Sequence, residues 1–397
     1  MDSHKVKNMQ FLRNANRAAI IKRLATQETV SRIELSSQLG LSKMAVSNIV
    51  SEMIEEHLIT EVGSVPLKNG KATSSGRRPT ALALVPNSIN GIAVWITRYQ
   101  LHCLAIEING QIFCHLCQEI PEDADNQFIS DSLRAMITRI LAVNPDMNFV
   151  GIGIASIGPL DIQKKKLLAP PNFCRISNLD LGAVLENAFP YRVFLDNDMN
   201  GIAMAEQLYG IGKGLNDLVY IGIGTGVGSG IIANGKILHG NGGFAGELGH
   251  ISIDPSGEYC SCGQRGCLEL YTRMASLLKK CGLSSLKELR QKLSSNPVPE
   301  LIAENMREYQ KAVEKAFVTI ANLFDPELII VGDQMLPFLT PMLPSIEAYM
   351  NTHMFHHGSR DIRVVPSSFG TRAPLVGAGA ILFQRVFSGE ISLRANE

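Results

Sequence analysis

The stretch SRIELSSQLGLSKMAVSNIVSEMIEE, residues 31–56, decides the fold of the N-terminal part of the chain. It opens with a capping box, in which Ser31 accepts a hydrogen bond from the Glu34 amide and Glu34 reaches back to Ser31. We expect a short helix to follow. Gly40 tolerates the backbone angles of a tight corner, and Ser42 can cap a second helix. The stretch therefore predicts two helices joined through a glycine turn, the helix-turn-helix pattern.

The second of these helices, residues 43–56, has one apolar and one polar face. Its apolar side chains at helical spacing are expected to be buried: Val46, Ile49, Val50 and Met53. The polar face lies near the start of the helix, where a recognition helix meets base edges. The candidate DNA contacts on it are Ser42, Lys43, Met44, Ser47, Asn48 and Ser51. The alternative is a small helical hairpin packed on the body, with its polar residues solvated.

The segment after this helix has the pattern of a wing. Residues 58–65 and 81–85 are typical of strands, and the loop between them is basic and includes Arg77 and Arg78. Such cations suit phosphates or a minor groove. With a first helix expected over residues 12–26, the whole predicts a winged helix-turn-helix domain that binds double-stranded DNA.

Composition and charge agree with such an arrangement. Of the 397 residues, 45% are hydrophobic and 19% are charged, which excludes a disordered chain. The formal net charge is zero, yet residues 1–80 hold twelve Lys and Arg against seven Asp and Glu. This surplus favours a polyanionic partner, although a solvated face would also explain it. There is no apolar run long enough for a membrane span and no secretory signal, so we expect a cytoplasmic protein without membrane insertion.

The cysteines suggest a metal site. His250, Cys260, Cys262 and Cys267 lie within 18 residues, and three thiolates with one imidazole are the ligand set of a closed, structural zinc site. The alternative is a redox-active or merely buried cysteine group. The remaining cysteines show no such spacing and are expected to be core thiols: Cys103, Cys114, Cys117, Cys174 and Cys281.

From about residue 88, strand-like runs alternate with helical stretches, which indicates an α/β body. Strands are expected at 90–96, 101–108, 149–156 and 218–223, and a helix at 128–143. The last strand runs into GTGVGSG, residues 224–230. Alternate glycines suit a phosphate or any tight strand turn, so this run leaves both alternatives open.

Several motifs resemble those of the ROK (repressor, open reading frame, kinase) family. The motifs SRxEL (31–35), LSKxAVS (41–47) and GRRPT (76–80) look like the N-terminal domain of ROK repressors, of the glucose/N-acetylglucosamine-type regulator branch. Residues 224–230 and 322–332 are similar to the nucleotide side of ROK sugar kinases, and 377–380 to the start of their C-terminal helix.

This resemblance implies an α/β fold with three domains. The expected parts are a winged helix-turn-helix domain (1–85), a first lobe (86–197) to which a C-terminal helix (380–397) returns, and a second lobe (198–379). The two lobes form an actin/sugar-kinase-like (ribonuclease-H-like) body, and the second carries the zinc loop and an oligomerisation surface.

The chain departs from the kinase pattern at the first phosphate loop. Kinases of the family have Asp-x-Gly-Gly-Thr there, whereas this chain has Ala93 in place of the aspartate and Trp95 and Ile96 in place of the glycines. An alanine cannot support a magnesium ion, and the two larger side chains fill the phosphate cradle. We therefore expect no enzyme activity. An active sugar kinase is the alternative, since Asp198 and the glycine run are retained.

The sugar side of the family pattern is retained. The resemblance implies that six positions form a sugar pocket: Asn172, Asn197, Asp198, Glu247, His250 and Glu269. Asp198 would be the vestigial catalytic base, and carboxylates suit neighbouring sugar hydroxyls. His250 would bind zinc through one ring nitrogen and turn the other toward the sugar.

Together, these features predict a repressor of carbohydrate uptake or metabolism genes. Operator half-sites need paired readers, so we expect a homodimer or homotetramer. The effector would be a sugar or sugar-phosphate, or a protein of a sugar-transport system.

Overall fold

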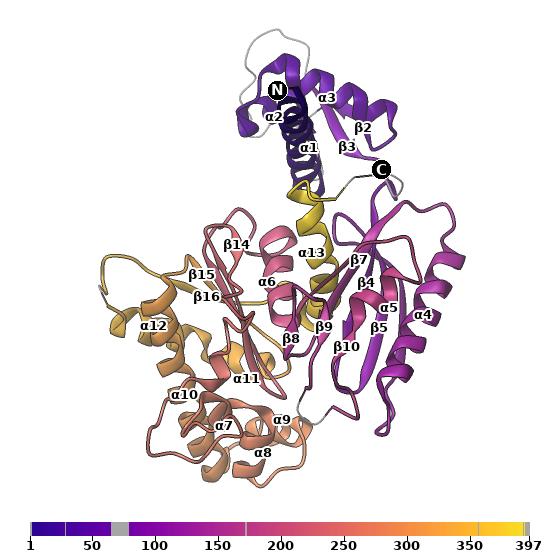
Figure 1. Cartoon of the computed structure of the whole chain (residues 1–397). Helices are drawn as coiled ribbons and strands as arrows, with labels where there is room; N and C mark the ends of the chain where they lie inside the picture. Colours follow the sequence, from indigo (N-terminus) through magenta and orange to yellow (C-terminus); the bar gives the residue numbers. More distant parts are fainter. Residues whose placement is uncertain are drawn as a thin grey trace. The chain divides into compact units, whose positions relative to one another are not determined.

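The computed structural model describes residues 2–27, 29–64, 79–170, 173–355, 357–391 and 393, with side chains from residue 12 onward. The chain forms two compact units (Figure 1). The first comprises Met1–Gly158, Ile162–Asp196 and Ala378–Glu397, and the second comprises Pro159–Asp161 and Asn197–Gly377. In the part of the chain that the structure describes, no helix is long and apolar enough to cross a membrane.

The N-terminal part of the first unit contains three helices and a small antiparallel sheet. The helices are α1 (Asp2–Gln27), α2 (Arg32–Leu39) and α3 (Lys43–Glu55). The strands β1 (Val30–Ser31), β2 (Ile59–Ser64) and β3 (Thr80–Leu84) lie in the order β1-β3-β2.

Local predictions for this part are confirmed. The capping box of Ser31 and Glu34 is present, and Gly40 adopts φ 65° at the end of α2. The hydroxyl of Ser42 caps α3, whose buried side chains are the four that were expected. Two features differ from the expectation. The helix α1 begins ten residues earlier than expected. The strand β1 was not predicted, because two residues are too few to show an alternation of apolar and polar side chains.

A five-stranded sheet forms the centre of the first unit's larger part. Its strand order is β11-β7-β4-β5-β6. The bounds are β4 (Asn90–Ile96), β5 (Gln100–Glu107), β6 (Ile112–Glu119), β7 (Phe149–Ser156) and β11 (Val193–Asn197). The same unit has helices α4 (Asn126–Val143) and α5 (Leu181–Glu186) and the two-residue strands β9 (Lys166–Leu167) and β10 (Leu179–Asp180), whereas the two-residue strand β8 (Leu160–Asp161) belongs to the second unit. The α/β pattern expected from the sequence is confirmed.

The helix α13 (Ala373–Phe387) packs directly on this sheet through residues of the first unit. A Cβ added at Gly153 would lie 2.3 Å from the Ala378 carbonyl oxygen, and one at Gly91 would lie 2.4 Å from Leu382. Glycine is therefore required at position 153 for the helix to approach so closely, whereas at position 91 the Leu382 side chain would have to shift.

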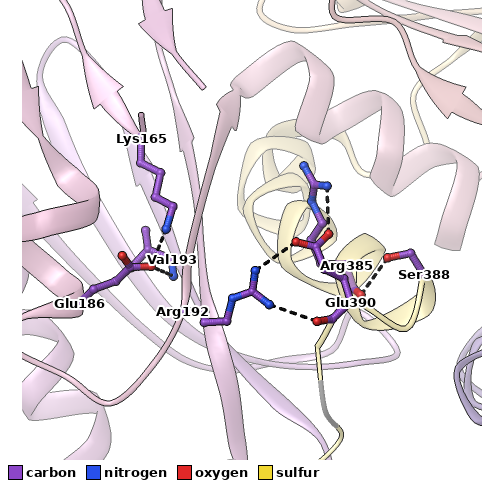
Figure 2. A network of polar contacts seen from close by, with 7 residues as sticks. All are labelled: Lys165, Glu186, Arg192, Val193, Arg385, Ser388 and Glu390. Carbon is purple, nitrogen blue, oxygen red and sulfur yellow. Dashed lines mark hydrogen bonds and ion pairs between the residues drawn. The ribbon is translucent and has the colours of Figure 1, made fainter. Parts of the chain in front are cut away.

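The expected C-terminal helix over 380–397 was wrong in its bounds, because α13 ends at Phe387 and Gly389 turns the chain with φ 77°. Ion pairs hold the segment after the helix (Figure 2). The carboxylate of Glu390 contacts Arg192 at 3.1 Å and Arg385 at 3.2 Å. Beside this group, Glu186 accepts from the Val193 amide and pairs with Lys165.

The second unit has its own five-stranded sheet, in the order β14-β13-β12-β15-β16. The strands are β12 (Leu218–Ile223), β13 (Val227–Ala233), β14 (Lys236–Ile237), β15 (Leu328–Gly332) and β16 (Arg363–Pro366). The helical segments are α6 (Asp198–Tyr209), η1 (Leu248–His250), α7 (Leu268–Thr272), α8 (Met274–Cys281), α9 (Leu286–Leu293), α10 (Glu300–Phe324), α11 (Leu336–Leu339), η2 (Thr340–Met342), α12 (Leu343–His353) and η3 (Gly370–Arg372).

Both faces of this sheet are covered at its centre, where β12 and β15 are buried along their whole length. Val219 and Ile221 of β12 belong to a core with α10 and α12. The alternate residue Tyr220 belongs to a second core, with Ile202 and Ala203 of α6. This arrangement fixes the start of α6 and the β12–β13 hairpin next to each other.

Candidate functional site

Four soft or borderline ligands meet in the second unit. The ligand atoms of His250, Cys260, Cys262 and Cys267 all lie within 4.8 Å of one another. The sulfur of Cys260 is 3.7 Å from Nδ1 of His250, and the sulfurs of Cys262 and Cys267 are 3.5 Å apart. Ligands bound tetrahedrally at zinc–ligand lengths of about 2.0–2.3 Å would be separated by about 3.3–3.8 Å. The cluster can therefore hold a metal ion.

A tight loop before α7 brings these ligands together. The Cys260 amide donates to the Gln264 carbonyl, and the Gly263 amide donates back to the Cys260 carbonyl. Gly266 has φ 64°, and a Cβ there would lie 1.7 Å from the Asp254 carbonyl oxygen, so only glycine fits. The hydroxyl of Tyr271 in α7 donates to Asp254 and fixes the loop to the helix.

The thiols do not ionise alike. Burial, followed by hydrogen bonds with Cys262 and Cys260, raises the pKa of Cys267 to about 12. Burial also opposes ionisation of Cys260, but hydrogen bonds from Cys262, His250 and Cys267 lower its pKa to about 7. A cation among these three crowded sulfurs would stabilise the thiolates.

Two carboxylates flank this cluster in the sequence and lie near each other in space. Glu247 precedes η1, and Glu269 is in the first turn of α7. Desolvation by the surrounding protein and the charge of Glu269 raise the pKa of Glu247, while His250 lowers it. The structure therefore brings together three of the predicted sugar residues: Glu247, His250 and Glu269.

Two further predicted sugar residues lie at the N-terminus of α6. Asn197 caps the helix by accepting from the Met199 amide at 2.9 Å. Asp198 follows it, is 9% exposed and accepts from the same amide. A carboxylate is stabilised at this end of a helix by the aligned peptide dipoles. The remaining predicted sugar residue, Asn172, lies outside the described residues.

The β12–β13 hairpin contacts both the N-terminus of α6 and Glu269 of α7. A Cβ at Gly222, Gly228 or Gly230 would lie 2.3–2.9 Å from Met199, which follows Asp198. Of the glycines in the run 224–230, Gly228 and Gly230 thus serve the close packing of α6. At the turn of the hairpin, the Val227 amide donates to Glu269 at 3.3 Å.

Asp333, which follows β15, is a residue that the sequence reasoning missed. Its carboxylate faces the hairpin turn, because a Cβ at Gly224 would lie 2.4–2.9 Å from the carboxylate atoms. Asp333 adopts φ 72°, an uncommon conformation for a residue other than glycine. No local sequence pattern predicts this role of Asp333, since Gly224 lies more than 100 residues away in the sequence.

The stretch that departs from the kinase pattern is regular strand. Ala93, Trp95 and Ile96 lie in β4, which pairs with β5 on one side and β7 on the other. Trp95 stacks on His102 with ring centroids 4.7 Å apart.

Of the thiols expected in the core, Cys117 and Cys174 are exposed, which corrects that expectation. Cys117 is exposed because it lies on the outward-alternating positions of the edge strand β6.

The polar face of α3 is open to solvent. Met44 is 75% exposed, and Ser42, Lys43, Asn48 and Ser51 are also exposed, whereas Ser47 is half-buried. Ion pairs join the other side of α3 to α1: Arg13 contacts Glu52 at 2.7 Å, and Arg17 contacts Glu56. These pairs offset negative charge at the C-terminal end of α3. The predicted wing residues Arg77 and Arg78 lie outside the described residues.

Residues 92–385 match the model described as the ROK family. The Xylose repressor of Bacillus spizizenii is 28% identical over 390 residues, which are 96% of this chain and 97% of that protein. The DNA-binding transcriptional dual regulator NagC of Escherichia coli is 25% identical over 396 residues, which are 96% of this chain and 95% of that protein.

Two solved structures are similar as well. A ROK family transcriptional regulator, described as a homolog of the E. coli MLC protein, has a TM-score of 0.80 at 25% identity, over 96% of this chain and 98% of that chain. The ROK hexokinase from Thermus thermophilus has a TM-score of 0.64 at 21% identity, over 74% of this chain and 97% of that chain. The body therefore has the fold of a ROK sugar kinase.

Proposed function

Because the chain belongs to the ROK family, we propose that it is a DNA-binding transcriptional repressor of carbohydrate genes, controlled by a sugar-type signal. The match to named repressors over 96% of the chain carries this proposal. The hexokinase matches over 97% of its own length but over only 74% of this chain. The part of this chain that the hexokinase does not match is long enough for an N-terminal domain made of α1 to β3, in which the polar face of α3 is open to solvent.

In this proposal, residues 1–85 form a winged helix-turn-helix and α3 reads the major groove. Asn48 suits the edge of an adenine, and Met44 suits a thymine methyl group. Lys43, at the first turn of α3, suits a phosphate. Ser42, Ser47 and Ser51 complete this surface, and Arg77 and Arg78 belong to the wing. Two copies of α3 in a homodimer or homotetramer would read two half-sites.

The body serves as the sensor in this proposal. Zinc at His250, Cys260, Cys262 and Cys267 would hold the loop between Glu247 and Glu269 in one conformation, so its role is structural. The two carboxylates and Asp198 then accept hydrogen bonds from sugar hydroxyls, together with Asn172, Asn197 and His250. Residues 86–197 and 198–379 are the two lobes of this sensor.

Phosphoryl transfer is not part of the proposed function. Trp95 and His102 stack within a continuous sheet at the stretch where kinases of the family place a phosphate loop. The carboxyl groups of Asp333 and Glu269 occupy the space beside the glycine turn of the β12–β13 hairpin, and ionised carboxylates there would repel nucleotide phosphates. A coupled ADP-release assay with a panel of hexoses tests this directly, and turnover would support the kinase alternative.

The experiment that tests the repressor function is selection of duplexes from a random pool by the full-length protein. We expect an enriched sequence with two related half-sites. Free, N-acetylated and phosphorylated sugars are then added to the selected complex, and fluorescence anisotropy follows release. Release by one sugar identifies the effector class. A complex that no sugar releases favours a sugar-transport protein as the inducer, and a pool without enrichment contradicts DNA recognition.

A further inference from the structure

Three side chains of the types that bind metals lie in the first unit, on the sheet formed by β4, β5 and β6. His102 of β5 and His115 of β6 approach each other, with Nδ1 of the first 3.0 Å from Nε2 of the second. Cys117 lies directly opposite His102 in the β5–β6 register. Because His115 and Cys117 are two residues apart on one strand, all three side chains share a face of the sheet.

The two imidazoles are spaced so that one ion could join them. One ring donates a proton to the other across the 3.0 Å contact. Two nitrogens bound to one ion at about 2.0–2.1 Å lie about 2.8–3.4 Å apart, for angles between a right angle and a tetrahedral one. An ion can thus replace the shared proton when the rings rotate, without movement of either strand.

Two of the three side chains are accessible, and the third is in a neutral form. His115 and Cys117 are exposed on the edge strand β6. His102 is 8% exposed. Burial, followed by the neighbouring His115 ring, lowers the pKa of His102 to about 4, so the imidazole is neutral at pH 7. Neutral imidazole is the form that binds metals.

We propose that His102, His115 and Cys117 form a second transition-metal site, which takes a borderline divalent ion such as Ni²⁺ or Zn²⁺. Imidazole and thiolate select such ions over Mg²⁺ and Ca²⁺, which require oxygen ligands. The site is open on the solvent side, so its ion exchanges more readily than an ion in the closed cluster around His250.

The chain carries its own reporter for this site. Trp95 is the only tryptophan in the sequence, and its ring stacks on His102 with centroids 4.7 Å apart and planes 20° apart. Ni²⁺ bound to His102 would lie close to this indole and quench its fluorescence.

The test is a titration of the full-length, zinc-loaded protein with Ni²⁺, followed by Trp95 fluorescence. We expect saturable quenching. His115→Gln keeps an amide near the former Nε2, which can still bond to His102, but an amide is a poor nickel ligand. We expect this variant to lose affinity for Ni²⁺ by at least about tenfold, as loss of a ligand should exceed the loss of a supporting group. His353→Gln, which changes an exposed histidine stacked on Tyr349 in the second unit, is the control.

Cys117→Ser changes an exposed side chain and gives a second readout that does not depend on the histidine hydrogen bond. We expect weaker Ni²⁺ binding in this variant too, and unchanged affinity would remove the thiol from the site. Quenching that is absent, that does not saturate, or that has the same affinity in His115→Gln as in the unmodified protein would overturn the proposal.

Discussion

The carboxylate of Glu269 accepts a hydrogen bond from the backbone amide of Val227 at 3.3 Å. Glu269 is two residues beyond Cys267 of the metal-ligating cluster, and Val227 opens the strand after the glycine turn. The contact therefore joins the cysteine loop to the β12–β13 hairpin. Because Met199 packs on the same hairpin, a disturbance of the loop should reach the start of α6.

Removal of the metal should weaken both stability and ligand response. We expect Cys260→Ala or Cys262→Ala to lose about one zinc ion per chain, since each four-ligand site holds one ion. The melting temperature should fall, because binding to the folded state is part of the folding free energy. Metal analysis and thermal unfolding measure these effects, with Cys174→Ala as the control at an exposed cysteine outside the cluster. Unchanged zinc content would contradict the assignment.

The charge of Glu269 can be separated from its hydrogen bond. In Glu269→Gln, the amide oxygen can still accept from Val227, so the melting temperature should change little. Glu269→Ala leaves that amide without its partner and should cost about 1–2 kcal/mol. Both variants should bind sugar more weakly, because both lack the carboxylate. Thermal shift with and without sugar measures the two effects, and equal stability losses in the two variants would exclude a role for the hydrogen bond.

The glycines of the hairpin should differ in their tolerance of alanine. A Cβ at Gly230 would lie 2.3 Å from the Met199 carbonyl oxygen and 2.7 Å from Ala203. Gly230→Ala should therefore destabilise the second unit by about 1–3 kcal/mol through overpacking. Gly226→Ala is the matched control, since its Cβ would contact only Oε2 of Glu269, at 3.2 Å, and no atom of α6. Similar denaturant midpoints for the two variants would argue against close packing of α6.

Arg13 and Arg17 of α1, which form ion pairs at the C-terminal end of α3, should contribute unequally, since Arg17 contacts both Glu52, at 3.8 Å, and Glu56. The side chain of Arg17 is 14% exposed and that of its partner Glu56 is 23% exposed, whereas Arg13 is 51% exposed. Arg17→Ala should cost about 1–3 kcal/mol, because it removes a charge-assisted hydrogen bond from a partly buried carboxylate. Arg13→Ala should cost less than about 1 kcal/mol, as is usual for surface pairs. Thermal unfolding of the two variants provides the comparison, and the reverse order would contradict this reading.

Substitution of Asn48 and of Lys43 in α3 should weaken binding to a selected duplex in different ways. Asn48→Ala should cost about 1–3 kcal/mol and relax the preference at one base pair. Lys43→Ala should weaken binding to all sequences alike and reduce the salt slope by about one. Anisotropy titrations at several salt concentrations distinguish the two, with Gln127→Ala on α4 as the control. Identical salt slopes and base preferences in both variants would contradict the assigned roles.

The short-range features could be predicted because they depend on neighbours in the chain. The capping box of Ser31, the turn at Gly40 and the buried stripe of α3 are set by interactions within about four residues. The spacing from His250 to Cys267 likewise identified a ligand set that the fold brings within 4.8 Å. In each case, the residue types and their separation are sufficient.

Other features required the tertiary structure. The glycine run fitted either a phosphate loop or a packing surface, and only the position of Met199 showed that Gly228 and Gly230 serve the packing of α6. The facing of Asp333 toward Gly224 and the pairing of His102 with His115 depend on which strands are neighbours and in what register. Sequence alone determined the local elements and the ligand types, because hydrogen bonds and periodicity act over a few residues. The fold decided which distant side chains meet, because strand register and helix packing are set by the whole core.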